Sequence, residues 1–334
     1  MKIEKIIIED YKILKNLQLD FTDKEGKPLD IIVLAGINGT GKTSILEYLR
    51  NHFFKNSNTI SHKGSRNIEI FYTDNKHFLF LPKNNKQKQF RQPIKKQSEN
   101  IIIEFIDYLI YEKKINPDKA YQKINYILQH IFKKFNLKFQ FSDRDRNKNI
   151  WFTNEQKKKI QLNELSDGEQ ELIEKGFTLY LSNIKNGLIL IDEPDSSLHP
   201  IWQKYLLEIY RNFAKENNTQ IILATHSPHI VASAEAEEVF LLYSNAETKK
   251  IEVSNLVKLS KFSKGRDINS VLSDIFGVSK RDEKYKEKIN KLYDYIEDEN
   301  LEKATKLLRE LTKLWGENDR EIVRANMYYE DLMD

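Results

Sequence analysis

The sequence predicts an α/β fold class: a core with a mixed sheet, a mainly helical insertion and a C-terminal helical tail. An apolar run that ends in glycine, residues 30–36, leads into a helical pattern at 44–54. A second apolar run at 187–192 alternates with helical patterns and with a third run at 220–226. Strands that are apolar throughout are typical of parallel sheets covered by helices on both faces.

Elements expected in order divide the chain into four parts. The first part of the core, residues 1–55, begins with a hairpin, because apolar and polar residues alternate with period two along 2–21. The insertion, residues 56–160, is rich in Lys, Asn and Gln and is expected to be mainly helical. Its expected helices are 98–114, with Ser98 as a cap, and one beginning at Asn116.

The second part of the core covers residues 161–255. Its expected helices and strands are 167–181, 187–192, 201–215, 220–226, 237–244 and 249–257. The C-terminal helical domain, residues 256–334, follows. Its expected helices are 267–276, 282–296, 301–315 and 319–334.

Composition fits a globular protein and excludes other classes. The 334 residues are 40% hydrophobic and 31% charged, far from a disordered composition. Fifty-four basic against 50 acidic residues leave a formal charge of +4, which does not indicate a nucleic-acid binder. The absence of cysteine excludes disulfides and favours a reducing, cytoplasmic location. No apolar run approaches the roughly 18 residues of a membrane helix, and the N-terminus is too charged for a signal peptide, so no membrane is expected.

Residues 36–43, GINGTGKT, fit the phosphate-binding pattern G-x-x-x-x-G-K-T between an expected strand and helix. Such a loop directs backbone N–H groups at a polyphosphate, and the dipole of the following helix favours negative charge. Lys42 would approach the β- and γ-phosphates, and Thr43 would bind Mg²⁺. The alternative is a glycine turn with an incidental lysine. The expected nucleotide-binding residues of this loop are Asn38, Gly39, Thr40, Gly41, Lys42, Thr43 and Ser44.

Residues 188–200, LILIDEPDSSLHP, bring two carboxylates to the carboxyl end of a strand, where ligands of open α/β sheets bind. Asp192 would hold Mg²⁺. Glu193 would be the general base for water attacking the γ-phosphate. A carboxylate that only caps a turn is the alternative.

Two more segments complete the candidate site. Ser166 and Gly168 begin an expected helix and could receive the γ-phosphate of an ATP bound to another subunit. Alternatively, Ser166 is only an N-cap, with Glu169 completing a capping box. His226 directly follows a buried strand, where it could hydrogen-bond the γ-phosphate; a lone histidine is otherwise usually structural.

These four motifs, in this order, resemble the ATP-binding-cassette class of ATPases, in the branch that contains RecF, SMC-type proteins and the ATPases of OLD-like and Septu phage-defence systems. The resemblance implies ATP and Mg²⁺ as cofactors, with two ATP molecules held between two head-to-tail cores. It also implies that Lys42, Glu193 and His226 are catalytic, and that Ser197 lies in the D-loop. The family's signature motif corresponds to residues 165–170, LSDGEQ, which include Ser166 and Gly168. Asp167 stands where the family usually has glycine or another small residue, and no glutamine stands out as the Q-loop residue.

The C-terminal stretch resembles the helical tail of ATPases encoded with an HNH nuclease in Septu and retron defence systems. We expect neither the Toprim nuclease domain of OLD-like proteins, because the residues after 255 have helical patterns, nor an HNH site, because the seven histidines are dispersed along the sequence. Lys-rich runs at 83–96 and 156–159 could contact DNA but are more typical of solvated surfaces.

We therefore expect an ATPase subunit of an anti-phage defence complex that dimerises and controls a separate HNH nuclease. The alternatives are a RecF- or SMC-like DNA repair ATPase and a scaffold that binds ATP with little turnover.

Overall fold

The structure is a computed structural model, and it describes residues 2–55, 60–63, 70–73, 78–80, 94–181, 184–195, 198–279 and 281–331. The chain divides into two compact units, Met1–Val271 and Leu272–Asp334. No helix of the described residues is both long and apolar enough to cross a membrane.

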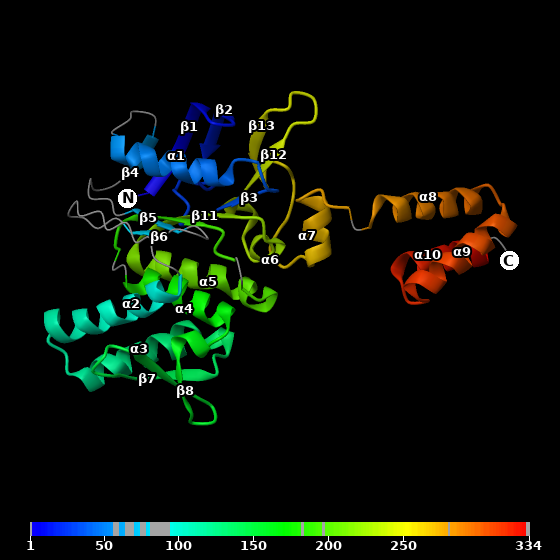
Figure 1. Cartoon of the computed structure of the whole chain (residues 1–334). Helices are drawn as coiled ribbons and strands as arrows, with labels where there is room; N and C mark the ends of the chain where they lie inside the picture. The colour runs from blue at the N-terminus through cyan, green and yellow to red at the C-terminus, as the bar shows by residue number, and fades with distance from the viewer. Residues whose placement is uncertain are drawn as a thin grey trace. The chain divides into compact units, whose positions relative to one another are not determined.

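Seven of the described strands form the central sheet, in the order β13-β12-β3-β11-β10-β5-β6 (Figure 1). Their bounds are β3 (Ile31–Ala35), β5 (Ile70–Thr73), β6 (Phe78–Phe80), β10 (Leu188–Asp192), β11 (Gln220–Thr225), β12 (Val239–Ser244) and β13 (Ile251–Asn255). The five inner strands are parallel, and β13 and β6 pair antiparallel at the two edges. Strands β3, β10 and β11 are buried at every position, which confirms the mixed α/β core with parallel inner strands.

One face of the sheet is covered by α1 (Lys42–Lys55) and by the expected hairpin, β1 (Lys2–Tyr11) and β2 (Leu14–Asp20) (Figure 1). Strand β1 also pairs with β4 (Ile60–Lys63). Isoleucine and leucine side chains of all these layers except β4 share one apolar core. This packing holds the β1–β2 turn close to the beginning of α1.

The other face is covered by α5 (Pro200–Asn217) and α4 (Asp167–Leu181), with α2 (Ile94–Asp107) packed against α4 (Figure 1). The absence of a side chain at Gly176 lets α4 approach Phe132: a Cβ there would lie 2.0 Å from the ring. Helix α4 is therefore closely packed against Phe132 at Gly176.

The insertion differs from the mainly helical segment that we expected, because it also contributes strands. Strands β5 and β6 join the central sheet, with β5 beside β10. A separate three-stranded sheet consists of β7 (Phe139–Arg144), β8 (Ile150–Asn154) and β9 (Lys159–Gln161). These strands are short, and strand propensity depends strongly on pairing and burial, so the local pattern among polar residues gave a weak signal.

The helices of the insertion also have different bounds from those expected. Helix α2 begins at Ile94 rather than near Ser98, and it continues as a π-helix, Tyr108–Glu112. Helix α3 (Pro117–Ile131) begins as expected, since the Asn116 side chain accepts a hydrogen bond from the Asp118 N–H at 2.8 Å. Short 3₁₀ helices lie at Lys133–Phe135, Leu162–Glu164 and Ala236–Glu238.

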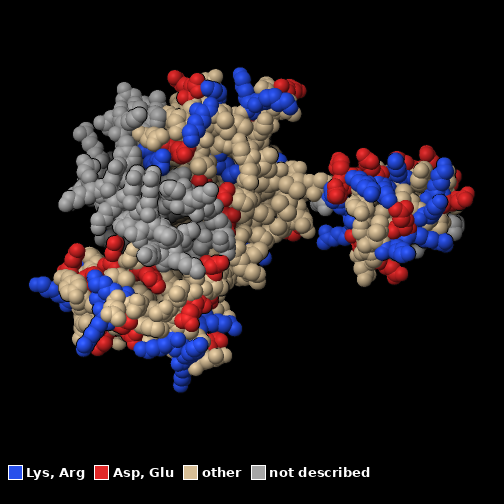
Figure 2. Space-filling view, in the orientation of Figure 1, with Lys and Arg blue, Asp and Glu red and all other residues tan. Residues whose placement is uncertain are grey.

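The remaining helices of the chain are α6 (Pro228–Val231), α7 (Ile268–Asp274), α8 (Glu283–Glu297), α9 (Leu301–Trp315) and α10 (Arg320–Asp331). Helices α8, α9 and α10 share an apolar core of leucine, isoleucine and alanine side chains, as their helical periodicity predicted. Figure 2 shows basic and acidic side chains interspersed over these helices.

Candidate nucleotide site

The glycine loop joins the end of β3 to the beginning of α1, as the motif predicted. Gly36 has φ +155° and Gly41 has φ +91°, values that disfavour a side chain. A Cβ on Gly36 would lie 2.5 Å from the Leu242 carbonyl oxygen, and one on Gly41 would lie 2.6 Å from Leu14. Both glycines are therefore required by close packing as well as by backbone conformation.

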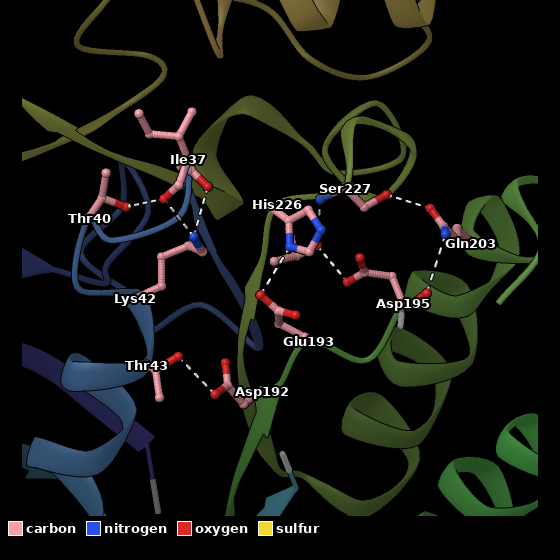
Figure 3. A network of polar contacts seen from close by, with 12 residues as sticks. Ile37, Thr40, Lys42, Thr43, Asp192, Glu193, Asp195, Gln203, His226 and Ser227 are labelled. Atoms are coloured by element: carbon pink, nitrogen blue, oxygen red, sulfur yellow. Dashed lines mark hydrogen bonds and ion pairs between the residues drawn. The ribbon is translucent and has the colours of Figure 1, made fainter. Parts of the chain in front are cut away.

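The other loop residues surround the Lys42 side chain. Asn38 and Gly39 are exposed, and Ser44 is half-buried in the first turn of α1. Thr40 is buried and donates its hydroxyl to the Ile37 carbonyl at 2.8 Å. The loop thus holds its conformation through its own backbone and side chains (Figure 3).

Lys42 is only 5% exposed, and its Nζ donates to the carbonyl oxygens of Gly36 at 2.8 Å and Ile37 at 2.9 Å. Burial lowers the pKa of Lys42, although the carboxylates of Glu193 and Asp192 oppose this shift. Among the described residues, no carboxylate is hydrogen-bonded to Lys42, and such a buried cation is suited to receive an anion.

Asp192 and Thr43 bring the two halves of the site together. The Thr43 hydroxyl donates to Asp192 Oδ2 at 2.8 Å, although the residues are 149 positions apart (Figure 3). The contact exists because β10 and β3 both flank β11, so their carboxyl ends meet at one edge of the sheet. A hydroxyl and a carboxylate are the oxygen ligands that Mg²⁺ prefers, so these two residues fit the ion.

Glu193 adopts an unusual backbone conformation directly after β10. Its φ is +46°, and its N–H donates to the Ala224 carbonyl at 2.9 Å. His226 Nδ1 lies 3.0 Å from Glu193 Oε1, so the two predicted residues are in direct contact (Figure 3). A glutamate in the left-handed region is strained, and such strain is concentrated at functional sites.

Sequence reasoning assigned no role to a group of polar residues that supports this pair. Thr225 donates to Asp195 Oδ1 at 2.6 Å, and it accepts from the Ser227 N–H at 2.9 Å. The Ser227 hydroxyl donates to Gln203 Oε1 at 2.6 Å. This network joins the loops after β10 and β11, and the second aspartate of DEPD was its one sequence signal.

The signature residues lie apart from the glycine loop. Ser166 is exposed at the beginning of α4 and donates to Glu169 Oε2 at 2.7 Å, while the Glu169 N–H lies 3.4 Å from the Ser166 hydroxyl. The capping-box alternative is therefore observed. In the described part of the chain, no hydrogen bond joins Ser166 to the glycine loop. Ser166 and Gly168 instead line an open hollow of about 580 Å³ with His199.

Ser197, the predicted D-loop residue, lies outside the described residues. Asp167 is exposed in the first turn of α4. Among the described residues, no group of three or more His, Asp or Glu side chains could hold a further metal ion.

Family models match both halves of the site. A model described as "AAA ATPase domain" matches residues 1–140, which contain the glycine loop. A model described as "AAA domain, putative AbiEii toxin, Type IV TA system" matches residues 106–232, which contain Ser166, Gly168, Asp192, Glu193 and His226. The chain is thus similar to AAA ATPase domains over residues 1–232. These residues contain Lys42, Glu193 and His226, the predicted catalytic residues.

Curated relatives of the chain include Septu protein PtuA of Bacillus mycoides (strain KBAB4), 25% identical over 83% of this chain and 45% of the relative. Septu protein PtuA of Bacillus thuringiensis is 34% identical over 35% of this chain and 29% of its own length. A retron Ec83 probable ATPase of Escherichia coli is 28% identical over 50% of this chain and 32% of its own length. The chain spans less than half the length of each of these relatives.

Among solved structures, the SmcHead bound to the C-winged helix domain of ScpA aligns with a TM-score of 0.49 and 15% identity, covering 78% of this chain and all of that chain.

Proposed function

We propose that this chain is the ATP-hydrolysing subunit of an anti-phage defence complex of the Septu and retron kind, and that it controls a separate HNH-type nuclease. The observation that carries the ATPase part is the Thr43–Asp192 hydrogen bond, 2.8 Å long, which joins the phosphate loop to the carboxylate at the end of β10. The defence role is supported by the Septu and retron relatives.

In the proposed mechanism, the glycine loop binds the phosphates through its backbone N–H groups. Lys42 exchanges its two carbonyl partners for phosphate oxygens. Thr43 and Asp192 hold Mg²⁺, which when bound offsets the negative charge of the phosphates. Glu193 accepts a proton from the attacking water, and His226 keeps the carboxylate oriented from 3.0 Å away.

A second copy of the chain completes the site in this proposal. Ser166 and Gly168 are accessible, and the N-terminus of α4 favours negative charge. A head-to-tail dimer would bring these residues to the γ-phosphate bound by Lys42 of the partner. The capping box does not prevent this, because the Ser166 hydroxyl can exchange Glu169 for phosphate.

Two variants test the ATPase and the dimer together. Glu193→Gln should bind ATP without turnover and therefore accumulate as a closed dimer, while Lys42→Ala should lose ATP binding and remain monomeric. Light scattering with and without ATP and Mg²⁺ measures the oligomeric state of both variants. A Glu193→Gln protein that stays monomeric with bound ATP would contradict the dimer.

Co-purification tests the nuclease partner. The protein is produced together with the product of the neighbouring gene, and the two are expected to elute as one complex. ATPase activity that DNA alone stimulates strongly, with no nuclease bound, would contradict this proposal and select the DNA repair alternative.

A further inference from the structure

A second pocket, distinct from the nucleotide site, lies between the insertion and the outer helices of the core. It has a volume of about 870 Å³ and is lined by residues of α2, the π-helix, α3, α4 and α5. The buried side chains of Leu109, Ile127 and Ile209 are among its lining residues. The volume lies within the range of small-molecule sites, roughly 300–1,000 Å³.

Tyrosine rings from three different helices line this pocket. They are Tyr108 of the π-helix, Tyr126 of α3 and Tyr180 of α4. Tyr126 is 59% exposed and stacks on His130, with ring centroids 3.9 Å apart and an interplanar angle of 22°. Exposed rings beside an apolar interior offer flat surfaces for a planar ligand.

Cations gather at the same pocket. Lys113, Lys123 and Lys185 are exposed lining residues from three segments, and Glu216 is the one acid among the described residues that line it. The Lys113 Nζ lies 5.4 Å from the centre of the Tyr108 ring, so one of these cations adjoins an aromatic face. The balance of charge favours an anionic ligand.

The Tyr180 hydroxyl adds a hydrogen-bond donor. Burial, together with the charge of Glu216, raises the pKa of Tyr180 to about 12, so the hydroxyl keeps its proton at neutral pH. The Tyr180 ring is held edge-on by Phe213, at a centroid distance of 5.3 Å. Tyr180 lies in the last turn of α4, the helix whose first turn carries Gly168.

The backbone of the pocket wall is irregular. The Lys113 N–H donates to the Tyr108 carbonyl at 3.0 Å, which is the five-residue spacing of a π-helix. Single π-helical turns occur frequently at functional sites, because they redirect side chains within a helix.

We propose that this pocket binds a nucleotide unit, a planar base that carries a phosphate, separately from the ATP site. The rings of Tyr126 and Tyr108 stack on the base, and the lysines with the Tyr180 hydroxyl bind the phosphate. Stacking on aromatic side chains combined with basic side chains is the general chemistry by which proteins bind unpaired nucleotides. The source is either a free nucleotide or a single-stranded nucleic acid.

The experiment measures binding of uridine 5′-monophosphate and of a labelled deoxythymidine tetranucleotide to the full chain. Both are measured in the wild-type protein and in Lys42→Ala, so that binding at the glycine loop is recognised. Saturable binding of the mononucleotide identifies a free nucleotide as the source, and binding of the tetranucleotide alone identifies a nucleic acid.

Matched variants decide whether the binding is at this pocket. Tyr126→Ala and Lys123→Glu should each weaken it about tenfold or more, because each removes a stacking or charge contact. Tyr111→Ala and Lys119→Glu change exposed residues of the same helices that do not line the pocket, and they should leave affinity unchanged. The proposal is overturned if neither probe saturates at millimolar concentration, or if the controls lose as much affinity as the pocket variants.

Discussion

Glu193 has two properties that can be tested independently: its carboxylate contacts His226, and its backbone has φ +46°. Glu193→Gln keeps the shape of the side chain and removes its charge. Loss of a general base lowers turnover by about 100- to 10,000-fold, which corresponds to about 3–5 kcal/mol of activation free energy. ATP binding should persist, because Lys42 and the glycine loop are unchanged.

The backbone conformation of Glu193 predicts that a glycine variant is more stable than an alanine variant, the reverse of the usual order. A residue with a Cβ costs about 1–2 kcal/mol in the left-handed conformation, whereas glycine elsewhere is less stable than alanine by about 0.5–1 kcal/mol. We therefore expect Glu193→Gly to be more stable than Glu193→Ala by up to about 1 kcal/mol. Both variants lose the carboxylate equally, so the comparison isolates the backbone.

Phosphate release measures turnover, and urea unfolding followed by circular dichroism compares the stability of the glycine and alanine variants at equal slope. Glu247→Gln, an exposed carboxylate in the β12–β13 turn, is the control and should behave like the wild type. Normal turnover in Glu193→Gln would refute its assignment as the base. An alanine variant more stable than the glycine variant would refute the argument from φ.

Three further predictions follow from the same geometry. Thr225→Val removes a donor to the buried Asp195 carboxylate and should lower the free energy of unfolding by about 1–3 kcal/mol in urea; an unchanged value would contradict the network. Gly176→Ala gains about 1 kcal/mol of helix propensity but meets Phe132 at 2.0 Å, an overpacking that costs about 1–3 kcal/mol, so it should destabilise. Phe132→Leu should lower the free energy of unfolding less in the Gly176→Ala variant than in the wild type. Additive effects of the two substitutions would contradict the clash. Because burial lowers the pKa of Lys42, this side chain should lose its charge at a lower pH than an ordinary lysine. Nucleotide affinity measured from about pH 7 to about pH 10 should fall as the charge is lost; a flat profile would contradict this.

Much of the fold followed from local patterns. The buried strands 187–192 and 220–226 were predicted because runs of apolar residues need cover on both faces, and both lie in the central sheet. Helix α3 was predicted at its first residue, since Asn116 before Pro117 satisfies the backbone N–H of the next turn. Such signals act over four or five residues and need no distant partner.

Strand β5 was missed for the opposite reason. It has only four residues, and pairing with β10, which is distant in the sequence, is what stabilises it. A short run of aromatic and β-branched residues within polar sequence does not indicate such a partner.

The residues of the nucleotide site could be recognised from spacing within each motif, because a phosphate loop needs its glycines, lysine and threonine at fixed positions along one turn of chain. Their relation to one another came only from the tertiary structure. The Thr43–Asp192 contact, the strained φ of Glu193 and the Asp195–Thr225 support all depend on parallel strands whose ends meet across the sheet. The second pocket also exists only in the tertiary structure, because its rings and lysines come from separate segments of the chain that pack side by side in the folded protein.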